Sequence, residues 1–178
     1  MYCPLCKHTS MHRNQLEENL TAFECGHCSG RWISSYQYWK WKEQSGKNLL
    51  EELGSEADKI TINDNPKAKL CPECGHFLRR FPVGHDLSFS LDHCGNCGGM
   101  WFDKNEWELL KSLHLHDNVH RIFSEIWQNQ VRDEQHAKSI ESLYITKFGK
   151  EDYKRIQDVK QWIQNHKLRS ELMAFLKA

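Results

Sequence analysis

The sequence predicts a small α+β fold for the first half of the chain and an all-α region for the second half. Three observations lead to this prediction. All 8 cysteines of the 178-residue chain lie before residue 98, in four Cys-x2-Cys pairs. Apolar and polar residues alternate between the last two pairs, as they do in half-buried strands. After residue 113 the cysteines stop and apolar residues recur at helical spacing, which is typical of amphipathic helices.

The four cysteine pairs form two copies of one pattern. The first pair of each copy has the sequence Cys-Pro-x-Cys-x-His, at residues 3–8 and 71–76. The second pair has the sequence Cys-Gly-x-Cys-x-Gly-x-Trp, at residues 25–32 and 94–101. Because the match extends beyond the cysteines, we expect two modules of the same design.

A hairpin is predicted between the two cysteine pairs of each module. In the second module residues 77–81 and 87–91 alternate between the two faces of a strand, and residues 84–86 have the sequence Gly-His-Asp, which is typical of a turn. In the first module only residues 20–23 have an extended pattern. The hairpin of the second module is therefore the clearer of the two.

A helix is predicted after the second cysteine pair of each module. The start signals are Ser34-x-x-Gln37 and Asp103-x-x-Glu106, because such pairs satisfy two free N–H groups at a helix N-terminus. After residue 113, apolar stripes predict further helices, with Gly149 as a stop between two of them. These stripes suit a small helical core, or packing on a partner.

The cysteine spacing is typical of structural zinc sites. A Cys-x2-Cys turn brings two sulfur atoms within reach of one ion, and the 18 or 19 residues between pairs let a hairpin return the second pair to the first. Structural zinc takes four such ligands in a tetrahedron. We therefore predict a small metal-stabilised fold with two structural Zn²⁺ ions, each bound by four cysteines: Cys3, Cys6, Cys25 and Cys28 in the first module, and Cys71, Cys74, Cys94 and Cys97 in the second.

Three other uses of the cysteines are less favoured. The residues that follow Met1 do not resemble a signal peptide, so we expect a cytoplasmic protein with reduced thiols and not two disulfides in each module. A redox Cys-x-x-Cys is disfavoured because no βαβ pattern surrounds any pair. Iron is the stronger rival, because a tetrahedral site with four sulfur ligands holds either metal.

Other residues recur near the predicted ligands. Trp32 and Trp101 each follow the last ligand of a module, and we expect their rings to cover the metal sites; the alternative is an aromatic platform for a base or a partner. Gly30, Gly75 and Gly98 are expected to provide tight or positive-φ positions in the turns. Four nearby histidines are not expected to bind metal, since the cysteines fill both sites: His8, His27, His76 and His93.

Charge and motifs argue against several classes of function. The 24 Lys and Arg residues balance the 24 Asp and Glu residues, and two sites with four thiolates each would bring the net charge to about −4. Nucleic-acid binders are usually basic. Four thiolates leave no open position for water, and no catalytic or nucleotide-binding motif is present, so we expect neither an enzyme nor a small-molecule substrate. No apolar stretch approaches the roughly 18 residues of a membrane helix, so no membrane contact is expected.

The expected organisation has four parts, namely a first module at 1–45, a linker at 46–69, a second module at 70–113 and a helical C-terminal region at 114–178. The linker is predicted because its residues begin with glycine, include several acids and end in Asn-Asp-Asn-Pro. We expect it to make the two modules separate cooperative units that are largely unfolded without metal. The helical region is expected to fold independently of metal.

The second module resembles the bacterial transcription-factor-IIB-type zinc-ribbon domains (zf-TFIIB). Residues 94–103 have their Cys-x-x-Cys-x-Gly-x-Trp pattern and lead into Glu106. The first module departs from the pattern, with Ser34 in place of an acid and Tyr-Trp-Lys-Trp at 38–41 in place of leucines. The resemblance implies two tandem zinc ribbons, each with cysteine knuckles, a β-hairpin and a short helix, and it implies zinc at all eight cysteines. Residues 150–176 also look like the tail that follows such ribbons in bacterial proteins.

Two functions fit these features. The first is a non-enzymatic adaptor that makes protein–protein contacts, with the transcription or translation machinery as a candidate partner. The second is a regulatory protein that binds DNA or RNA through its hairpins, where Arg79 and Arg80 lie beside Phe77 and Phe81. Arginine next to aromatic residues can grip phosphates and stack bases. We favour the adaptor because the chain lacks a basic patch, and nothing in the sequence indicates an oligomeric state.

Overall fold

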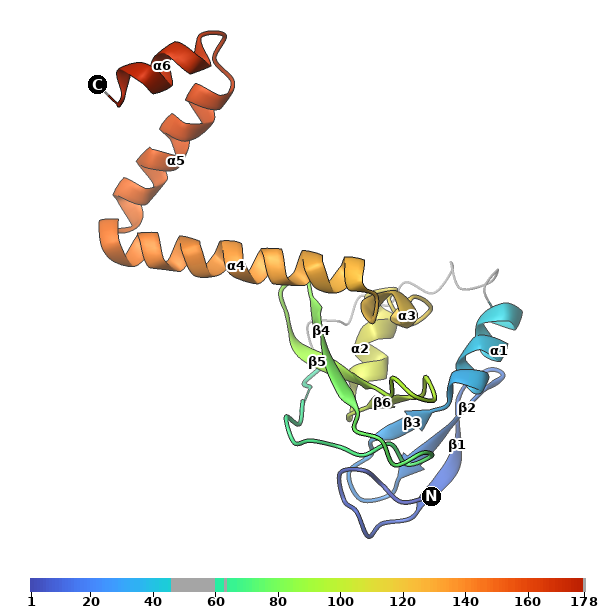
Figure 1. The fold of residues 1–178 in the computed structure, drawn as a ribbon. Coiled ribbons are helices and arrows are strands. Elements are labelled where there is room, and N and C mark those ends of the chain that lie inside the picture. Colours follow the sequence, from blue (N-terminus) through green and yellow to red (C-terminus); the bar gives the residue numbers. More distant parts are fainter. Residues whose placement is uncertain (46–59, 63, 178) are drawn as a thin grey trace. The chain divides into compact units, whose positions relative to one another are not determined.

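The computed structural model describes residues 1–45, 60–62 and 64–177 (Figure 1). Most of the predicted linker, residues 46–59 and residue 63, lies outside these described residues. The chain forms two compact units, Met1–Val131 and Arg132–Ala178, which we call the ribbon unit and the helical unit. No helix in the described part of the chain is both long and apolar enough to cross a membrane.

The ribbon unit contains two ribbons with the same order of elements. Each has a hairpin, a short third strand and a helix, and the all-α region follows, so the predicted fold class is confirmed. The first ribbon consists of β1 (Met11–Glu17), β2 (Leu20–Cys25), β3 (Arg31–Ile33) and α1 (Ser35–Ser45). The second ribbon consists of β4 (Arg79–Gly84), β5 (Leu87–His93), β6 (Met100–Phe102) and α2 (Glu106–Ser112).

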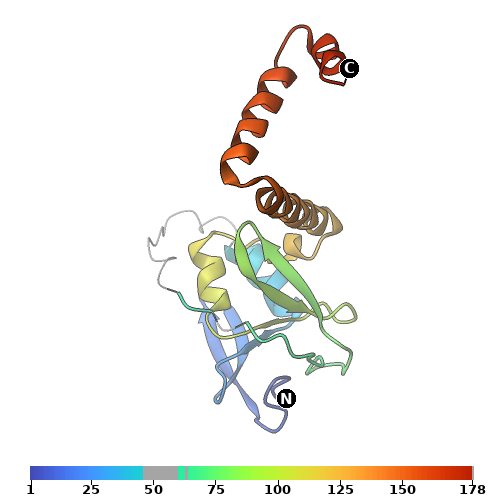
Figure 2. The same ribbon diagram turned by 90° about the vertical axis from the view of Figure 1, so that its left-hand side faces the viewer.

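The two ribbons share one antiparallel sheet with the strand order β1-β2-β3-β6-β5-β4. The third strands pair at its centre, with Trp32 opposite Trp101. Figures 1 and 2 show the blue strands of the first ribbon beside the green strands of the second. Each third strand has three residues and gains its second hydrogen-bonded neighbour from the other ribbon. The ribbons are thus not the separate modules expected from the sequence.

This strand order has an internal symmetry. The counterparts in the two ribbons are β1 and β4, β2 and β5, and β3 and β6, and they lie at equal distances from the centre of the sheet. The two ribbons are therefore related by a pseudo-two-fold axis that passes between β3 and β6. A self-complementary pairing of this kind places matching residues of the repeat face to face. The repeat in the sequence therefore appears in the fold as the pseudo-two-fold symmetry of the sheet.

The helices of both ribbons close over one apolar core. Trp41 of α1 and Trp107 of α2 are fully buried, and their rings meet edge-on with centroids 5.8 Å apart. Tyr38 and Leu110 lie in the same core. Tyr38 and Trp41 match Trp107 and Leu110 in the repeat, so the aromatic residues that replace leucines in the first ribbon supply much of the shared core.

The helical region does not begin as an independent part where the cysteines end. α3 (Val119–Ile122) adds its first and last residues to the core of the ribbon unit. α4 (Glu125–Phe148) begins on the second hairpin, where Trp127 Nε1 donates a hydrogen bond to Val83 O at 2.8 Å. The ribbon unit therefore extends to Val131, and only the residues after it are candidates for a metal-independent part.

The helical unit contains the rest of α4, followed by α5 (Lys150–Gln164) and α6 (Arg169–Phe175). Gly149, with a φ of 80°, separates α4 from α5 as predicted. Ile163 is the only buried residue in the described part of this unit. The apolar stripes therefore do not form the small helical core that the sequence suggested, and most of them face solvent.

Candidate metal centres

The structure assembles the eight cysteines into the two predicted groups of four. The Sγ atoms of Cys3 and Cys28 are 3.6 Å apart, and those of Cys71 and Cys97 are 3.5 Å apart. A tetrahedron with zinc–sulfur distances of about 2.3 Å requires sulfur–sulfur separations of about 3.8 Å, so each group fits one ion. Disulfide sulfurs lie about 2.05 Å apart, so the distances exclude disulfides. Within each group all sulfur atoms lie within 4.8 Å of one another: Cys3, Cys6, Cys25 and Cys28, and Cys71, Cys74, Cys94 and Cys97.

Each Cys-x2-Cys pair forms a tight turn around its first sulfur atom. In the first turn the backbone N–H of Cys6 donates to Cys3 Sγ at 3.3 Å. Gly75 and Gly98 have positive φ, whereas at Gly30 the preceding residue adopts that conformation and the glycine is instead a tight position. A residue with positive φ follows the second cysteine of each pair: Lys7, Ser29, Gly75 and Gly98.

Four of the eight metal-free thiols hold their protons more tightly than ordinary cysteines. Burial raises the pKa of Cys3 and Cys71 to about 11, and it also raises the pKa of Cys28 and Cys97. Burial acts in the same direction on Cys25, but backbone N–H groups outweigh it and lower the pKa of Cys25. The pKa of Cys74 is also lowered, to about 6, because the backbone N–H of His76 stabilises its thiolate. A divalent cation that binds thiolates must therefore displace several protons, and metal affinity is expected to fall as the pH falls.

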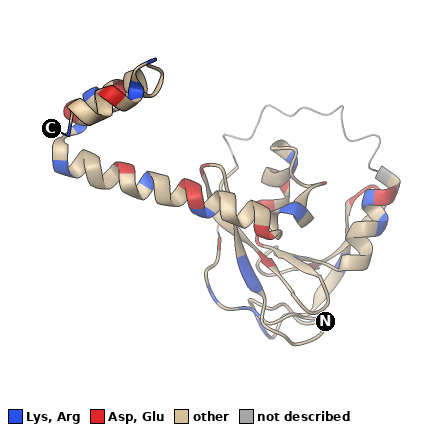
Figure 3. Ribbon diagram, turned by 45° about the horizontal axis from the view of Figure 1, so that its top comes forward, with Lys and Arg blue, Asp and Glu red and all other residues tan. Residues whose placement is uncertain are grey.

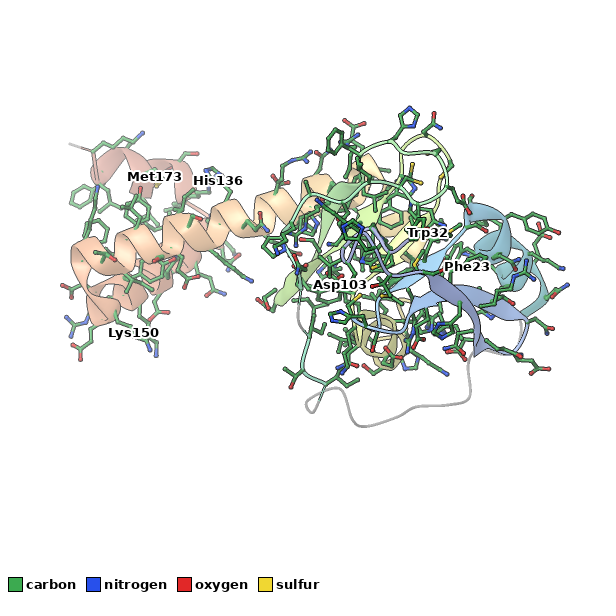
Figure 4. All side chains as sticks on the ribbon, turned by 90° about the horizontal axis from the view of Figure 1, so that it is seen from below. Phe23, Trp32, Asp103, His136, Lys150 and Met173 are labelled. Carbon is green, nitrogen blue, oxygen red and sulfur yellow. The ribbon has the colours of Figure 1, made fainter. Side chains whose placement is uncertain are left out.

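Trp32 and Trp101 are fully buried among the cysteines of the two groups. Each ring packs on the glycine that lies two residues after the last cysteine of the other ribbon. A Cβ atom added to Gly30 would lie 2.1 Å from Trp101 Cζ2, and one added to Gly99 would lie 2.1 Å from Trp32 Cζ2. Figure 4 labels Trp32 within the ribbon unit. The rings cover the metal groups as predicted, but each covers the opposite ribbon, and the platform alternative is wrong because neither ring is exposed.

The histidines near the cysteines belong to neither group of candidate ligands. His27 Nδ1 lies 3.4 Å from Cys6 Sγ, which places it beside a ligand. His93 stacks on Phe123, with ring centroids 4.3 Å apart. These positions agree with the expectation that the cysteines alone complete both groups.

The two arginines proposed for nucleic-acid binding have different surroundings, because neighbouring residues of a strand face opposite sides. Arg80 is partly buried, and its guanidinium donates to Asp64 Oδ1 at 2.6 Å. Arg79 is exposed, and its guanidinium lies over the ring of Phe81 at 5.2 Å from the centroid. The side chain of Phe77 is 71% exposed. Arg79 is therefore available for a ligand, whereas Arg80 is engaged in an ion pair.

A buried lysine ties the segment before the second ribbon to the sheet. Lys69 is fully buried, and its Nζ donates to Asp92 Oδ2 at 2.7 Å and to Asn65 O at 2.8 Å. It also lies 3.4 Å from Asp103 Oδ2. The described residues between 60 and 69 therefore belong to the ribbon unit, although their composition predicts a linker. Their sequence has no periodic signal that could have revealed this contact.

Glu106 is buried beside two other carboxyl groups. One oxygen each from Asp64, Asp103 and Glu106 lies within 4.8 Å of the other two. Burial and the charge of Asp103 raise the pKa of Glu106 to about 9, so this side chain holds a proton at neutral pH. Its Oε2 accepts a hydrogen bond from the Asp103 N–H at 2.8 Å, which is half of the predicted capping pair. The other half is missing because Asp103 Oδ1 accepts from Trp101 Nε1.

The comparisons with known proteins agree with this geometry for the second ribbon. Residues 70–113 match the family described as Transcription factor zinc-finger. The match contains the second cysteine group, and the first group has the same arrangement without a match of its own. No curated protein and no solved structure matches the chain. Residues 70–113 thus carry a zinc-ribbon domain, and both groups of four cysteines are consistent with structural zinc.

Proposed function

We propose that the protein is a non-enzymatic zinc-binding adaptor that makes protein–protein contacts, with the transcription or translation machinery as its partner class. The observation that carries the proposal is the contrast between complete metal groups and exposed helices. Four thiolates around one ion leave no position for water or substrate, so the metal would supply stability and not chemistry. The helical unit leaves most of its large apolar side chains exposed, and such surfaces mark interaction sites.

The last two helices are suited to dock into a groove of a partner. Ile156 and Val159 of α5 are exposed and follow the i, i+3 spacing that amphipathic helices use for groove binding. The two helices and the residues that flank α6 expose seven large apolar side chains: Ile156, Val159, Trp162, Leu168, Met173, Phe175 and Leu176. Net charge supports a protein partner, because two zinc–thiolate groups would leave the balanced chain at about −4.

The second candidate is DNA or RNA binding through the two hairpins. Its support is an arginine beside an aromatic ring on each hairpin: Arg79 lies over Phe81, and the Arg13 guanidinium lies 5.8 Å from the centroid of Phe23. Arg80 is held by Asp64, which leaves one exposed arginine on this strand. Each phosphate contact contributes about 0.7–0.9 to the salt slope, so two contacts would support only weak binding.

Copurification from the native host, with nuclease treatment, tests the adaptor function. We expect a protein partner that still copurifies after nuclease treatment. The partner should no longer copurify with Val159→Asp on the apolar face of α5, and it should still copurify with Gln161→Asp on the polar face. The matched control introduces the same charge into the same helix. Micromolar binding to DNA or RNA at physiological salt that is lost with Arg79→Ala and Arg13→Ala, without such a partner, would favour the second candidate instead.

A further inference from the structure

The half of α4 that lies in the helical unit carries an exposed apolar stripe. Its large apolar side chains are 41–50% exposed: Ile140, Leu143, Tyr144 and Phe148. The rings of Tyr144 and Phe148 stack with centroids 5.4 Å apart, which fixes one end of the stripe as a flat apolar surface. None of the described residues after Val131 in this helix is buried, so the described part of the chain leaves the stripe uncovered.

The two ends of this stripe carry opposite charges. Asp133, Ile140 and Lys147 follow one another at intervals of seven residues, which places them in line on one face of a helix with 3.6 residues per turn. Ile140 lies midway between the two charges. Both charged side chains are exposed, and neither has an ion-pair partner among the described residues. Figure 3 shows charged residues of both signs along α4.

We propose that two copies of this chain pair through α4 in an antiparallel arrangement, with the two-fold axis at Ile140. This arrangement places Asp133 of each copy opposite Lys147 of the other and buries the apolar stripe between them. A parallel arrangement would instead place Asp133 against Asp133 and Lys147 against Lys147, so charge selects the antiparallel register. A two-fold interface must be self-complementary, and a stripe with opposite charges at equal distances from its centre meets that requirement.

The stripe of α4 is a small interface. From Asp133 to Lys147 the helix rises about 21 Å, and a single helix pair of this length covers less than the roughly 1,200–2,000 Å² of a typical stable interface. The pairing is therefore expected to be weak and to depend on concentration. The exposed apolar side chains of α5, namely Ile156, Val159 and Trp162, are left for the partner of the adaptor function. This self-association is separate from the adaptor function, which can hold whether or not the chain pairs with itself.

Sedimentation equilibrium on the full zinc-loaded chain tests the pairing. We expect a mass that rises with concentration from 21.1 kDa towards twice that value. Ile140→Asp places a charge on the two-fold axis and should hold the chain at the monomer mass. Ser142→Asp places the same charge on the opposite face of the helix and should leave the pairing intact, and circular dichroism should show equal helix in both variants. A single-chain mass for the wild type at every concentration, or pairing that persists in Ile140→Asp, overturns the proposal.

Charge reversal tests the register. Asp133→Lys and Lys147→Asp should each weaken self-association about tenfold, because each creates two like-charge pairs in place of two opposite ones. The double variant Asp133→Lys with Lys147→Asp restores both pairs with their signs exchanged and should recover the wild-type affinity. Failure of the double variant to recover would rule out the antiparallel register. A chain that stays monomeric while another protein covers Ile140 would overturn the proposal as well.

Discussion

The two ribbons share a plan, and they differ in what holds their outer edges. At the centre of the sheet the repeat is closely matched, since Gly30 and Gly99 each accept the tryptophan ring of the opposite ribbon. At the edges the match ends. The second hairpin is held by the buried Lys69 and by the start of α4, whereas the first hairpin is held by the side chain of Glu17, which reaches α2 of the second ribbon.

This difference separates two kinds of stabilisation. The matched centre makes the ribbons depend on one another, because neither tryptophan can be buried unless the opposite ribbon is folded. The unmatched edges make the second ribbon the more firmly anchored of the two. Metal, core and edge contacts should therefore contribute in that order, and each can be removed separately.

Removal of metal should have the largest effect. Zinc binding in finger peptides contributes about 10–16 kcal/mol, whereas a typical domain is stable by about 5–15 kcal/mol. We expect chelation to unfold both ribbons together and to remove the helical signal of α1, α2 and α3, since these helices pack on the ribbon core. Circular dichroism and tryptophan fluorescence during chelation and zinc re-addition would show this. If one ribbon stayed folded while the other unfolded, the claim that the two ribbons depend on one another would be wrong.

The central glycines should come next. Gly30→Ala and Gly99→Ala each place a Cβ atom 2.1 Å from a buried tryptophan ring, and each should lower the free energy of unfolding by about 3 kcal/mol or more. Gly95→Ala is the control, because a Cβ atom there meets nothing within 4 Å, and it should change stability by less than about 0.5 kcal/mol. Denaturant unfolding of the zinc-loaded protein measures all three. Clearly unequal effects of Gly30→Ala and Gly99→Ala would contradict the pseudo-two-fold arrangement.

These glycines show how far the sequence could predict the site. The cysteine ligands, the clearer hairpin and the helix start at Ser34 follow from local spacing, and the structure confirms that the Gln37 N–H donates to Ser34 Oγ at 3.3 Å. The sequence predicts a turn position for Gly30, because a glycine near a cysteine knuckle usually lies in a turn. Its actual role depends on Trp101, which lies far away in the sequence. The shared Gly-x-Trp spacing was the available signal, but it does not state which tryptophan covers which glycine.

The contacts between distant segments were beyond local patterns for the same reason. The pairing of β3 with β6 joins two strands of three residues, and strands so short carry almost no periodic signal. Lys69 lies in a segment whose composition is that of a linker, and its burial depends on carboxylates supplied by β5 and by the residues after β6. The helical stripes leave two alternatives open, a helical core or a partner, because apolar periodicity predicts that a face is covered but does not identify what covers it.

Glu106 should produce a smaller effect that depends on pH. Gln37 holds the matching position in the first ribbon and is only partly buried, whereas Glu106 is fully buried with a pKa raised from 4.5 to about 9. The folded state therefore binds more protons than the unfolded state between these values, so the free energy of unfolding falls as the pH rises, by up to about 1.4 kcal/mol per pH unit. Glu106→Gln makes this position resemble the first ribbon and should flatten the profile between about pH 7 and 9. Parallel profiles for the two proteins would show that Glu106 does not hold its proton.

The edge contact of the first hairpin should have the smallest effect. Glu17 Oε1 accepts a hydrogen bond from Trp107 Nε1 at 3.1 Å, and its Oε2 accepts from Lys111 Nζ at 2.9 Å. Glu17→Ala should lower the free energy of unfolding by about 1 kcal/mol, because the buried Trp107 N–H loses its acceptor whereas the Lys111 ammonium stays partly solvated. The exposed neighbour Glu18→Ala is the control and should have almost no effect. If Glu17→Ala lowered the free energy of unfolding as much as the glycine variants do, the edge contact and not the centre of the sheet would be the main source of stability in the first ribbon.

The central claim is that two metal ions hold one cooperative ribbon unit. Native mass spectrometry during chelator titration of the wild type, Cys25→Ser and Cys94→Ser tests it most directly. The wild type should carry two zinc ions. Each variant should lose its own ion and should release the remaining ion at least about a hundredfold more readily, because unfolding of one ribbon removes the packing of a tryptophan ring, about 3–5 kcal/mol, from the other. A variant that holds its remaining zinc as tightly as the wild type, with the other ribbon still folded, would contradict the account.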